Sequence, residues 1–233
     1  QYGSVFAHVI GYSDTELGKT GLESVENFEL LTSNAFFVEK IQNEFNGEKN
    51  MGDTVVTTLD ADLQQAAYDA LGDNKGAVIV MEADTGKILA MVSKPTFDPN
   101  EIRTEWESLN SDEENSPLLN RATNGSYAPG SSFKVVTTLA FMRQNSSYAD
   151  YTYDCTGGIT VGDTTIHCAG GSVHGHEDLE SSLANSCNTS FSNIGLSLNI
   201  PEYRETAEDL LFNESLPSVL DYTKSSFALT EDS

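Results

Sequence analysis

Residues 129–141 read PGSSFKVVTTLAF, and this stretch decides both the fold and the site that the sequence predicts. Pro129 and Gly130 predict a sharp turn into a helix. Behind the turn, side chains suited to burial recur at i, i+3, i+4, i+7 and i+8, which predicts one buried helix face: Phe133, Val136, Thr137, Ala140 and Phe141. Ser131 therefore stands at the start of a buried helix.

Ser131 and Lys134 form an S-x-x-K motif at this helix start. Residues three apart share a helix face, with Cβ atoms about 5–6 Å apart, so the hydroxyl and the amine can meet. A partly desolvated lysine has a lowered pKa and can take the proton of a serine nucleophile. The amide groups of a helix N-terminus suit a developing oxyanion. A surface Ser and Lys would show the same spacing, so the motif needs support from elsewhere in the chain.

The tripeptide Ser186-Cys187-Asn188 supplies part of that support. It splits two predicted helices, 178–185 and 188–198, and side chains at such a break can project into a cleft. Asn188 is the expected N-cap of the second helix. A last helix is predicted to begin at Pro201, as an N1 proline. The side chains expected inward from these two helices are Phe191, Ile194, Leu198, Tyr203, Ala207, Leu210 and Leu211.

Upstream, the pattern predicts a helix over 60–72, capped by Asp60 and closed by Gly72. Its expected inward face is Leu63, Ala66, Ala67, Ala70 and Leu71. Two antiparallel strands follow over 76–80 and 88–92, and their near-continuous apolar character predicts a covered pair. Residues 94–114 are predicted as loop. Residues 1–50 look loosely organised, with helical patterning at 26–31 and 35–45.

Composition narrows the function classes. The chain has 233 residues, of which 38% are hydrophobic, with 12 Lys+Arg against 36 Asp+Glu and a net charge of −24. The apolar share predicts a packed core, and the length suits one large domain or one and a half. The negative charge excludes a nucleic-acid binder, which needs a basic surface, and disfavours anionic lipid as a partner. No run approaches the ~20 apolar residues of a membrane span.

Cysteines and histidines are few. Cys155 and Cys168 flank a predicted short hairpin and could face each other, and the sequence leaves open whether they form a disulfide in an oxidising compartment. Cys187 would then stay free. His174 and His176, with Asp178 close by, fit a loop or the start of a helix better than a metal site, because a full ligand set is lacking. We expect no metal and no cofactor.

Three stretches together resemble a known family. They are GAVIVMEADTGKILAMVSKPTFDPN (76–100), PLLNRATNGSYAPGSSFKVVTTLAF (117–141) and HGHEDLESSLANSCNTSFSNIGLSL (174–198), and they are similar to the transpeptidase domain of class B penicillin-binding proteins. FAHVIGYSDTELGKTGLESVENFELL (6–31) resembles the end of the non-catalytic region of penicillin-binding protein A-like members. The resemblance implies an α/β (α+β) fold, an antiparallel sheet flanked by helices with the active site at the sheet edge. Residues 1–50 would end the non-catalytic region and 51–233 would begin the transpeptidase domain.

The resemblance also implies roles. Ser131 would attack the penultimate D-Ala carbonyl of a peptidoglycan stem peptide, with Lys134 as base. Ser186 would relay a proton to the leaving amine, and Asn188 would hold the substrate amide and orient Lys134. β-Lactams would be trapped on the same serine.

The resemblance also implies substrate-binding residues, partners and a cellular location. Tyr127 and Cys187 are the expected substrate-binding residues. The expected partners are stem peptides ending in D-Ala-D-Ala, β-lactam antibiotics and other cell-wall synthesis proteins. The expected location is the extracytoplasmic face of the bacterial membrane, through an anchor outside this chain, which begins with Gln1 and reads as a processed or excised piece. A non-catalytic β-lactam sensor or scaffold and a serine β-lactamase are the alternatives, and the segment 1–50 favours a penicillin-binding protein over a compact β-lactamase.

The third box of the family, K-T-G, is a decoy here. Lys19-Thr20-Gly21 spells it, but far upstream of Ser131, whereas the family's box follows S-x-N. No K-T-G follows Asn188. We therefore expect residues 1–233 to be one portion of a catalytic domain that a second, C-terminal segment completes.

Overall fold

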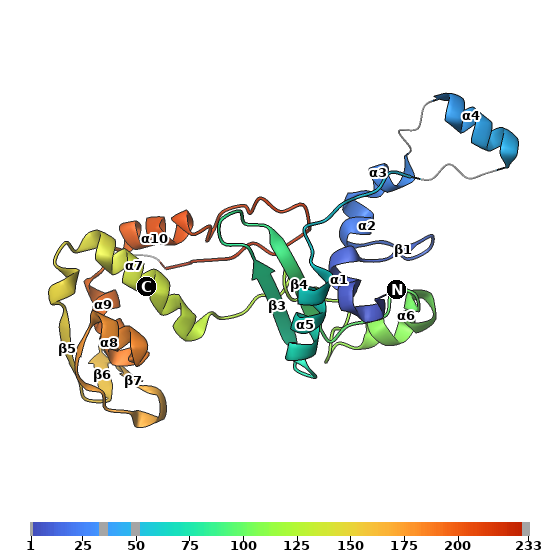
Figure 1. Cartoon of the computed structure of the whole chain (residues 1–233). Helices are drawn as coiled ribbons and strands as arrows, with labels where there is room; N and C mark the ends of the chain where they lie inside the picture. The colour runs from blue at the N-terminus through green and yellow to red at the C-terminus, as the bar shows by residue number, and fades with distance from the viewer. Residues whose placement is uncertain (1, 33–36, 48–51, 230–233) are drawn as a thin grey trace. The chain divides into compact units, whose positions relative to one another are not determined.

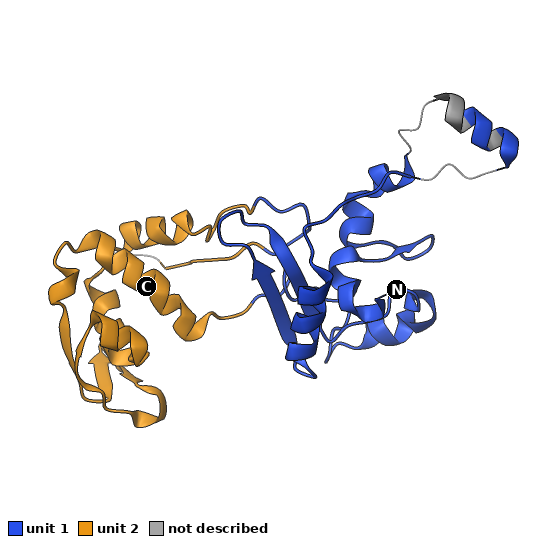
Figure 2. Cartoon of the chain, viewed as in Figure 1, with its two compact units in different colours: residues 1–126, 217–223 blue, residues 127–216, 224–233 orange. Residues whose placement is uncertain are grey.

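The computed structural model describes residues 2–32, 37–47 and 52–229 (Figure 1). The chain forms two compact units: unit 1 holds residues 1–126 and 217–223, and unit 2 holds 127–216 and 224–233 (Figure 2). Every strand pair in the described part of the chain is antiparallel, and helices pack on the strands. The predicted α/β (α+β) class is thus confirmed. None of the described helices combines the length and apolar character that a bilayer crossing requires.

Unit 1 begins with short elements and continues with a helix-covered hairpin. Its elements are η1 Gly3–Phe6, α1 Ala7–Ile10, β1 Ser13–Asp14, β2 Gly18–Lys19, α2 Gly21–Val25, α3 Asn27–Leu31, α4 Phe37–Asn46, α5 Ala61–Leu71, β3 Gly76–Met81, β4 Ile88–Lys94 and α6 Ile102–Ser111. The predicted helix 35–45 corresponds to α4, and its first two residues lie outside the described ones.

Helix α5 starts as the sequence predicts, but its inward face is only partly the expected one: Ala67 is buried and Leu71 packs beside it, whereas Ala66 and Ala70 are exposed. The Asp60 carboxylate caps it by accepting from the backbone of Leu63 at 2.9 Å. The fully buried side chain is Gln64, whereas the expected Leu63 is 39% exposed. Gln64 is buried because its amide pairs with both backbone groups of Met91, each at 2.8 Å. A buried amide that is fully hydrogen-bonded escapes the desolvation cost that makes polar residues look external in a sequence.

The predicted covered strand pair is confirmed for β4 and wrong for β3. β4 is buried on both faces because α5 lies on one side and the segment around Leu119 on the other, where Ser93 Oγ donates to the Leu119 carbonyl at 3.1 Å. β3 alternates, and Ile79 and Met81 remain 45% and 56% exposed. In the described part of the chain β3 pairs only with β4, so its other edge has no partner strand.

Residues 94–114 are not all loop, because α6 lies within them. Ile102 is buried and Trp106 packs edge-on against Tyr12, with ring centroids 6.4 Å apart. The acidic, polar surface of this helix hides its apolar contact stripe, which explains why the periodicity is weak in the sequence.

Unit 2 is built on the predicted nucleophile helix. Its elements are η2 Gly130–Phe133, α7 Lys134–Gln144, η3 Tyr148–Asp150, β5 Thr152–Cys155, β6 Gly158–Val161, β7 Thr164–His167, η4 Ala169–Gly171, β8 Gly175–Asp178, α8 Leu179–Ala184, α9 Asn188–Ser197 and α10 Ile200–Asp209. Its core confirms most of the expected inward residues: Val136, Ala140, Phe141, Phe191, Ile194, Leu198, Tyr203 and Ala207. Leu210 and Leu211 are exceptions, exposed because α10 ends at Asp209 and Leu211 has a positive φ.

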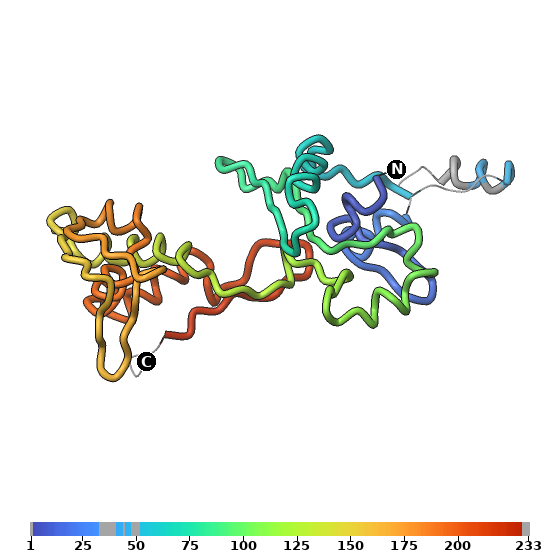
Figure 3. Tube along the Cα trace, turned by 90° about the horizontal axis from the view of Figure 1, so that it is seen from below, coloured from blue at the N-terminus to red at the C-terminus, as the bar shows by residue number. Residues whose placement is uncertain are grey.

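Residues 217–223, near the C-terminus, belong to unit 1. Thr223 donates from its backbone to the Thr123 carbonyl at 2.9 Å and from its hydroxyl to the Asn124 carbonyl at 3.1 Å. Figure 3 shows this segment beside the chain that leaves β4 and α6. Unit 1 therefore includes two stretches that are distant in the sequence.

His8 makes the stability of unit 1 depend on pH. Its Nε2 donates to the Pro117 carbonyl at 2.8 Å, and its ring meets Phe97 edge-on. Burial lowers the pKa of His8 from 6.5 to about 4, helped by the charge of Arg121 and opposed by the Pro117 hydrogen bond. In this range the unfolded chain binds a proton at His8 that the folded chain does not.

We expect the free energy of unfolding to be fully retained above pH 6.5 and to fall as the pH drops towards 4. The His8 share of that loss is at most about 3 kcal/mol. Urea unfolding at several pH values should show a smaller acid-induced loss for His8→Gln than for the wild type, while exposed His176→Gln behaves as wild type. Equal pH dependence of His8→Gln and wild type would contradict the assignment.

Candidate active site

The nucleophile candidate lies in a tight turn ahead of the α-helix. Residues 130–133 form the 3₁₀ turn η2, and α7 begins at Lys134. Ser131 therefore lies in the turn before the α-helix and not at the first position of the helix, where the sequence places it. Gly130 has a φ of 57°, and Ser132 Oγ donates to the Pro129 carbonyl at 2.6 Å. A 3₁₀ turn has 3.0 residues per turn, so i and i+3 eclipse. Ser131 Oγ and Lys134 Nζ accordingly lie 3.3 Å apart.

The second part of the candidate site is the break between α8 and α9. Ser186 adopts a φ of 52°, a left-handed conformation that is strained for a residue with a side chain. Two backbone hydrogen bonds hold it there, from Ser186 N to the Leu183 carbonyl at 3.0 Å and from Cys187 N to the Ser182 carbonyl at 2.9 Å. The expected N-cap Asn188 is instead the first residue of α9, because the Cys187 sulfur caps the helix.

The turn that carries Ser131 and the break between α8 and α9 both contact the Lys134 amine. Nζ lies 2.6 Å from the Ser186 carbonyl, 2.9 Å from Ser186 Oγ and 2.7 Å from Asn188 Oδ1. Asn188 is oriented from its other end, where Nδ2 donates to the His167 carbonyl at 3.0 Å. The structure thus brings Ser131, Lys134, Ser186 and Asn188 together from two stretches of unit 2, residues 131–134 and 186–188.

The surroundings of Lys134 lower its pKa and so shift the amine towards its neutral form. Burial lowers the pKa of Lys134, and the thiols of Cys187 and Cys168 oppose this in part. Nζ also lies 5.6 Å from the centre of the Phe191 ring, an apolar neighbour. Ser131 and Ser186 are exposed at the surface, so their hydroxyls are open to a ligand.

This geometry allows proton transfer. A neutral lysine amine has two N–H donors and one lone pair. The Ser186 carbonyl and Asn188 Oδ1 can only accept, so they engage the N–H groups. The lone pair is then left for a hydroxyl hydrogen, and the hydroxyls within reach are those of Ser131 and Ser186. An amine held in this way can remove the proton of Ser131.

Two other residues, Tyr127 and Cys187, are predicted from the sequence to contact the substrate. Tyr127 is 65% exposed on the segment that leads into η2. Cys187, for which the sequence predicts substrate contact, is fully buried, and its thiol lies 3.3 Å from Thr189 Oγ1 and 3.7 Å from the Cys168 sulfur. The buried side chain gives that expectation no support, and contact between Cys187 and a substrate stays a prediction.

Lys19 of the decoy tripeptide lies in β2 of unit 1, where its amine donates to the Asn27 side chain. Gly21 has a φ of 56°, and a Cβ there would lie 2.8 Å from the backbone of Ile10 and Gly11. Close backbone packing therefore accounts for the glycine of this tripeptide.

Sequence reasoning misses the His167 carbonyl and the strained backbone of Ser186. Neither leaves a signal in the sequence, because a backbone carbonyl carries no residue identity and a left-handed serine follows no motif. The helix break at 186–188 is the nearest available signal.

Comparison with known proteins places this geometry in context. Residues 76–233 match the family described as the penicillin binding protein transpeptidase domain, and residues 1–55 match the penicillin binding protein A dimerisation domain. The peptidoglycan D,D-transpeptidase PbpA of Mycolicibacterium smegmatis is 34% identical over 232 residues, which cover 92% of this chain and 47% of that protein. The chain therefore spans about half the length of the curated relatives that it matches first.

Solved structures agree. The D,D-transpeptidase domain of a peptidoglycan glycosyltransferase from Eggerthella lenta superposes with a TM-score of 0.85 at 31% identity, covering 99% of this chain and 51% of that one. The penicillin G acyl-enzyme complex of penicillin-binding protein A from M. tuberculosis gives a TM-score of 0.86 at 30% identity, covering 96% and 56%. The resemblance stated from the sequence is confirmed.

Proposed function

This chain belongs to the penicillin-binding protein transpeptidase family, and on that premise we propose that it is a serine D,D-transpeptidase that cross-links peptidoglycan stem peptides and is acylated by β-lactams. The observation that carries the proposal is the position of the Lys134 amine, 3.3 Å from Ser131 Oγ and 2.9 Å from Ser186 Oγ. One base within reach of two hydroxyls suits a reaction that moves a proton from nucleophile to leaving group.

In the proposed acylation step, Ser131 Oγ bonds to the penultimate D-Ala carbonyl carbon while Lys134 takes its proton. The backbone N–H of Ser131 lies in the first turn of η2, where such groups lack an intrahelical acceptor, and it would donate to the oxyanion. When the tetrahedral intermediate collapses, the peptide C–N bond breaks, and the proton passes from Lys134 through Ser186 Oγ to the departing D-Ala amine. An acyl-enzyme ester on Ser131 remains.

Deacylation reverses these roles. The amine of a second stem peptide attacks the ester carbonyl and gives up a proton, and the ester C–O bond breaks as Ser131 regains its hydrogen. The product is a new amide cross-link. A β-lactam enters the same path, but ring opening keeps the leaving nitrogen attached to the acyl group, so the acyl-enzyme persists. Asn188 would hold the substrate amide while its own amide keeps Lys134 in place.

We further propose that the protein acts at the cell wall, on the extracytoplasmic side of the membrane, beside other cell-wall synthesis proteins. The curated relatives are named as peptidoglycan transpeptidases, which supports this setting.

The decisive assay uses the protein expressed from its full gene, a donor stem pentapeptide ending in D-Ala-D-Ala, and an acceptor stem peptide with a free amine. We expect release of D-Ala together with a cross-linked product of matching mass, both by mass spectrometry. Steady hydrolysis of penicillin without cross-linking would instead indicate a serine β-lactamase. Acylation by penicillin without any transfer product would indicate a sensor or scaffold. Either result would overturn the proposal.

A further inference from the structure

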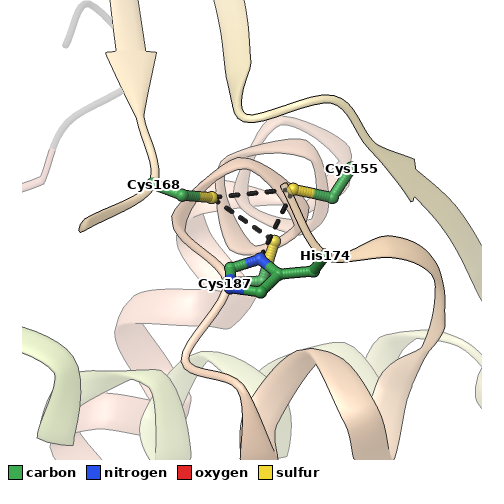
Figure 4. Close-up of side chains that lie close together, drawn as sticks. All are labelled: Cys155, Cys168, His174 and Cys187. Atoms are coloured by element: carbon green, nitrogen blue, oxygen red, sulfur yellow. Dashed lines mark hydrogen bonds between the residues drawn. The ribbon is translucent and has the colours of Figure 1, made fainter. Parts of the chain in front are cut away.

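Behind the candidate active site, four metal-ligating side chains converge in unit 2 (Figure 4). The sulfurs of Cys155 and Cys168 are 3.7 Å apart, as are those of Cys168 and Cys187, and Cys155 Sγ lies 3.4 Å from His174 Nδ1. All four ligand atoms lie within 4.8 Å of one another. The three cysteines are free thiols and are at most 3% exposed.

The fold brings these residues together from separate elements. Cys155 ends β5 and pairs with Gly175 of β8, which places the preceding residue, His174, beside it. Cys168 follows β7, and Cys187 is the N-cap of α9. Four ligands on three strand ends and one helix cap form a closed site that no single segment supplies.

We propose that Cys155, Cys168, His174 and Cys187 bind one Zn²⁺ ion in a structural site. Zinc binds thiolate sulfur at about 2.3 Å and imidazole nitrogen at about 2.0–2.1 Å in tetrahedral geometry. A tetrahedron of those dimensions has sulfur–sulfur edges of about 3.8 Å and sulfur–nitrogen edges of about 3.6 Å. The spacings of 3.7 Å and 3.4 Å correspond to those edges.

The chemistry of the donor set fits the same ion. Soft thiolates with one imidazole select zinc over calcium or magnesium, and a set of four protein ligands leaves no open position, as in structural zinc sites. A disulfide would use two of the three sulfurs and leave the third buried beside it. Outer groups are also in place, since Ser190 N donates to Cys187 Sγ at 3.4 Å and Thr189 Oγ1 donates to Cys155 Sγ at 3.2 Å.

The sequence groups His174 with His176 and Asp178, but these two neighbours have partners other than the cysteines. His176 pairs with Asp154 at 2.9 Å on the exposed side of β8, and Asp178 caps α8 by accepting from Ser181 N. Only His174 turns towards the sulfurs. The expectation of no metal arises from grouping His174 with its sequence neighbours.

The site also supports the candidate active site, an inference that rests on the proposed function. Cys187 lies between Ser186 and Asn188, and Cys168 follows His167, whose carbonyl holds the Asn188 amide. A metal that fixes these two cysteines would therefore fix the acceptors of the Lys134 amine. The four ligands act as positioning residues, since none of them touches the reacting atoms.

Metal content tests the site itself. The protein expressed from its full gene and purified without chelator under reducing conditions is expected to contain about one zinc per chain by elemental analysis. Co²⁺ exchanged into it should give the intense thiolate-to-cobalt absorption of a multi-thiolate site. His174→Ala should lose most of its zinc, whereas the matched control His176→Ala keeps it. Wild type that neither holds zinc nor binds Co²⁺ would overturn the proposal, and so would a disulfide between two of the cysteines in the native protein.

The link to activity is tested separately. Removing zinc with a chelator should lower the melting temperature and slow penicillin labelling by about tenfold or more, and added Zn²⁺ should restore both. Ser131→Ala should keep its zinc while losing the label, so failure of the metal site and failure of the proposed function are distinguishable. Unchanged labelling after complete zinc removal would refute the supporting role.

Discussion

Replacing Ser131 with alanine is expected to abolish the covalent adduct of a fluorescent penicillin. The proposed acyl-enzyme is an ester of the Ser131 hydroxyl, and alanine has no oxygen to form it. The fold should survive, because Ser131 is exposed and its hydroxyl contacts only Lys134 in the described residues. The measurement is in-gel fluorescence of the wild type and the variant, with the modified residue mapped by mass spectrometry.

Ser132→Ala is the matched control for this prediction. Ser132 is the adjacent exposed serine of the same turn, but its hydroxyl donates to the Pro129 carbonyl at 2.6 Å and not to Lys134. We expect it to label like the wild type. An adduct that persists in Ser131→Ala, or that maps to another residue in the wild type, would mean that the nucleophile lies elsewhere.

Lys134→Ala is expected to slow acylation by about 10²–10⁴-fold, the usual contribution of a positioned general base. Without the amine, the Ser131 proton has no acceptor within hydrogen-bond distance in the described structure. The second-order rate constant of penicillin acylation, followed by quenched-flow labelling, measures the effect. Lys224→Ala, which removes an exposed lysine of unit 2, should react at the wild-type rate.

The variant Lys134→Arg distinguishes a role of Lys134 as a proton acceptor from a role of its positive charge. A guanidinium keeps the positive charge and can donate to Ser186 and Asn188, but it is not deprotonated near neutral pH and so cannot accept a proton. We therefore expect Lys134→Arg to be nearly as slow as Lys134→Ala. A rate close to that of the wild type would show that Lys134 acts by its charge, and the proposed proton transfer would be wrong.

Sequence reasoning succeeds where one stretch of chain is sufficient. The Asp60 cap locates α5, periodicity locates α7 and α9, and the packed face of α7 follows from its spacing. Sequence reasoning fails where a partner far away in the chain decides whether a residue is buried or exposed. Gln64 is buried because the Met91 backbone satisfies its amide, and α6 packs through Ile102 and Trp106 against a cluster that includes Tyr12.

The same division runs through the candidate site. Ser131 and Lys134 lie one turn apart, so the sequence alone determines that their side chains meet, because local helical geometry dictates that distance. Only the tertiary structure decides that the Lys134 amine reaches Ser186 and that His174 joins the sulfurs of three distant cysteines. Those contacts depend on strand pairing and on packing between segments far apart in the chain, which no local spacing specifies.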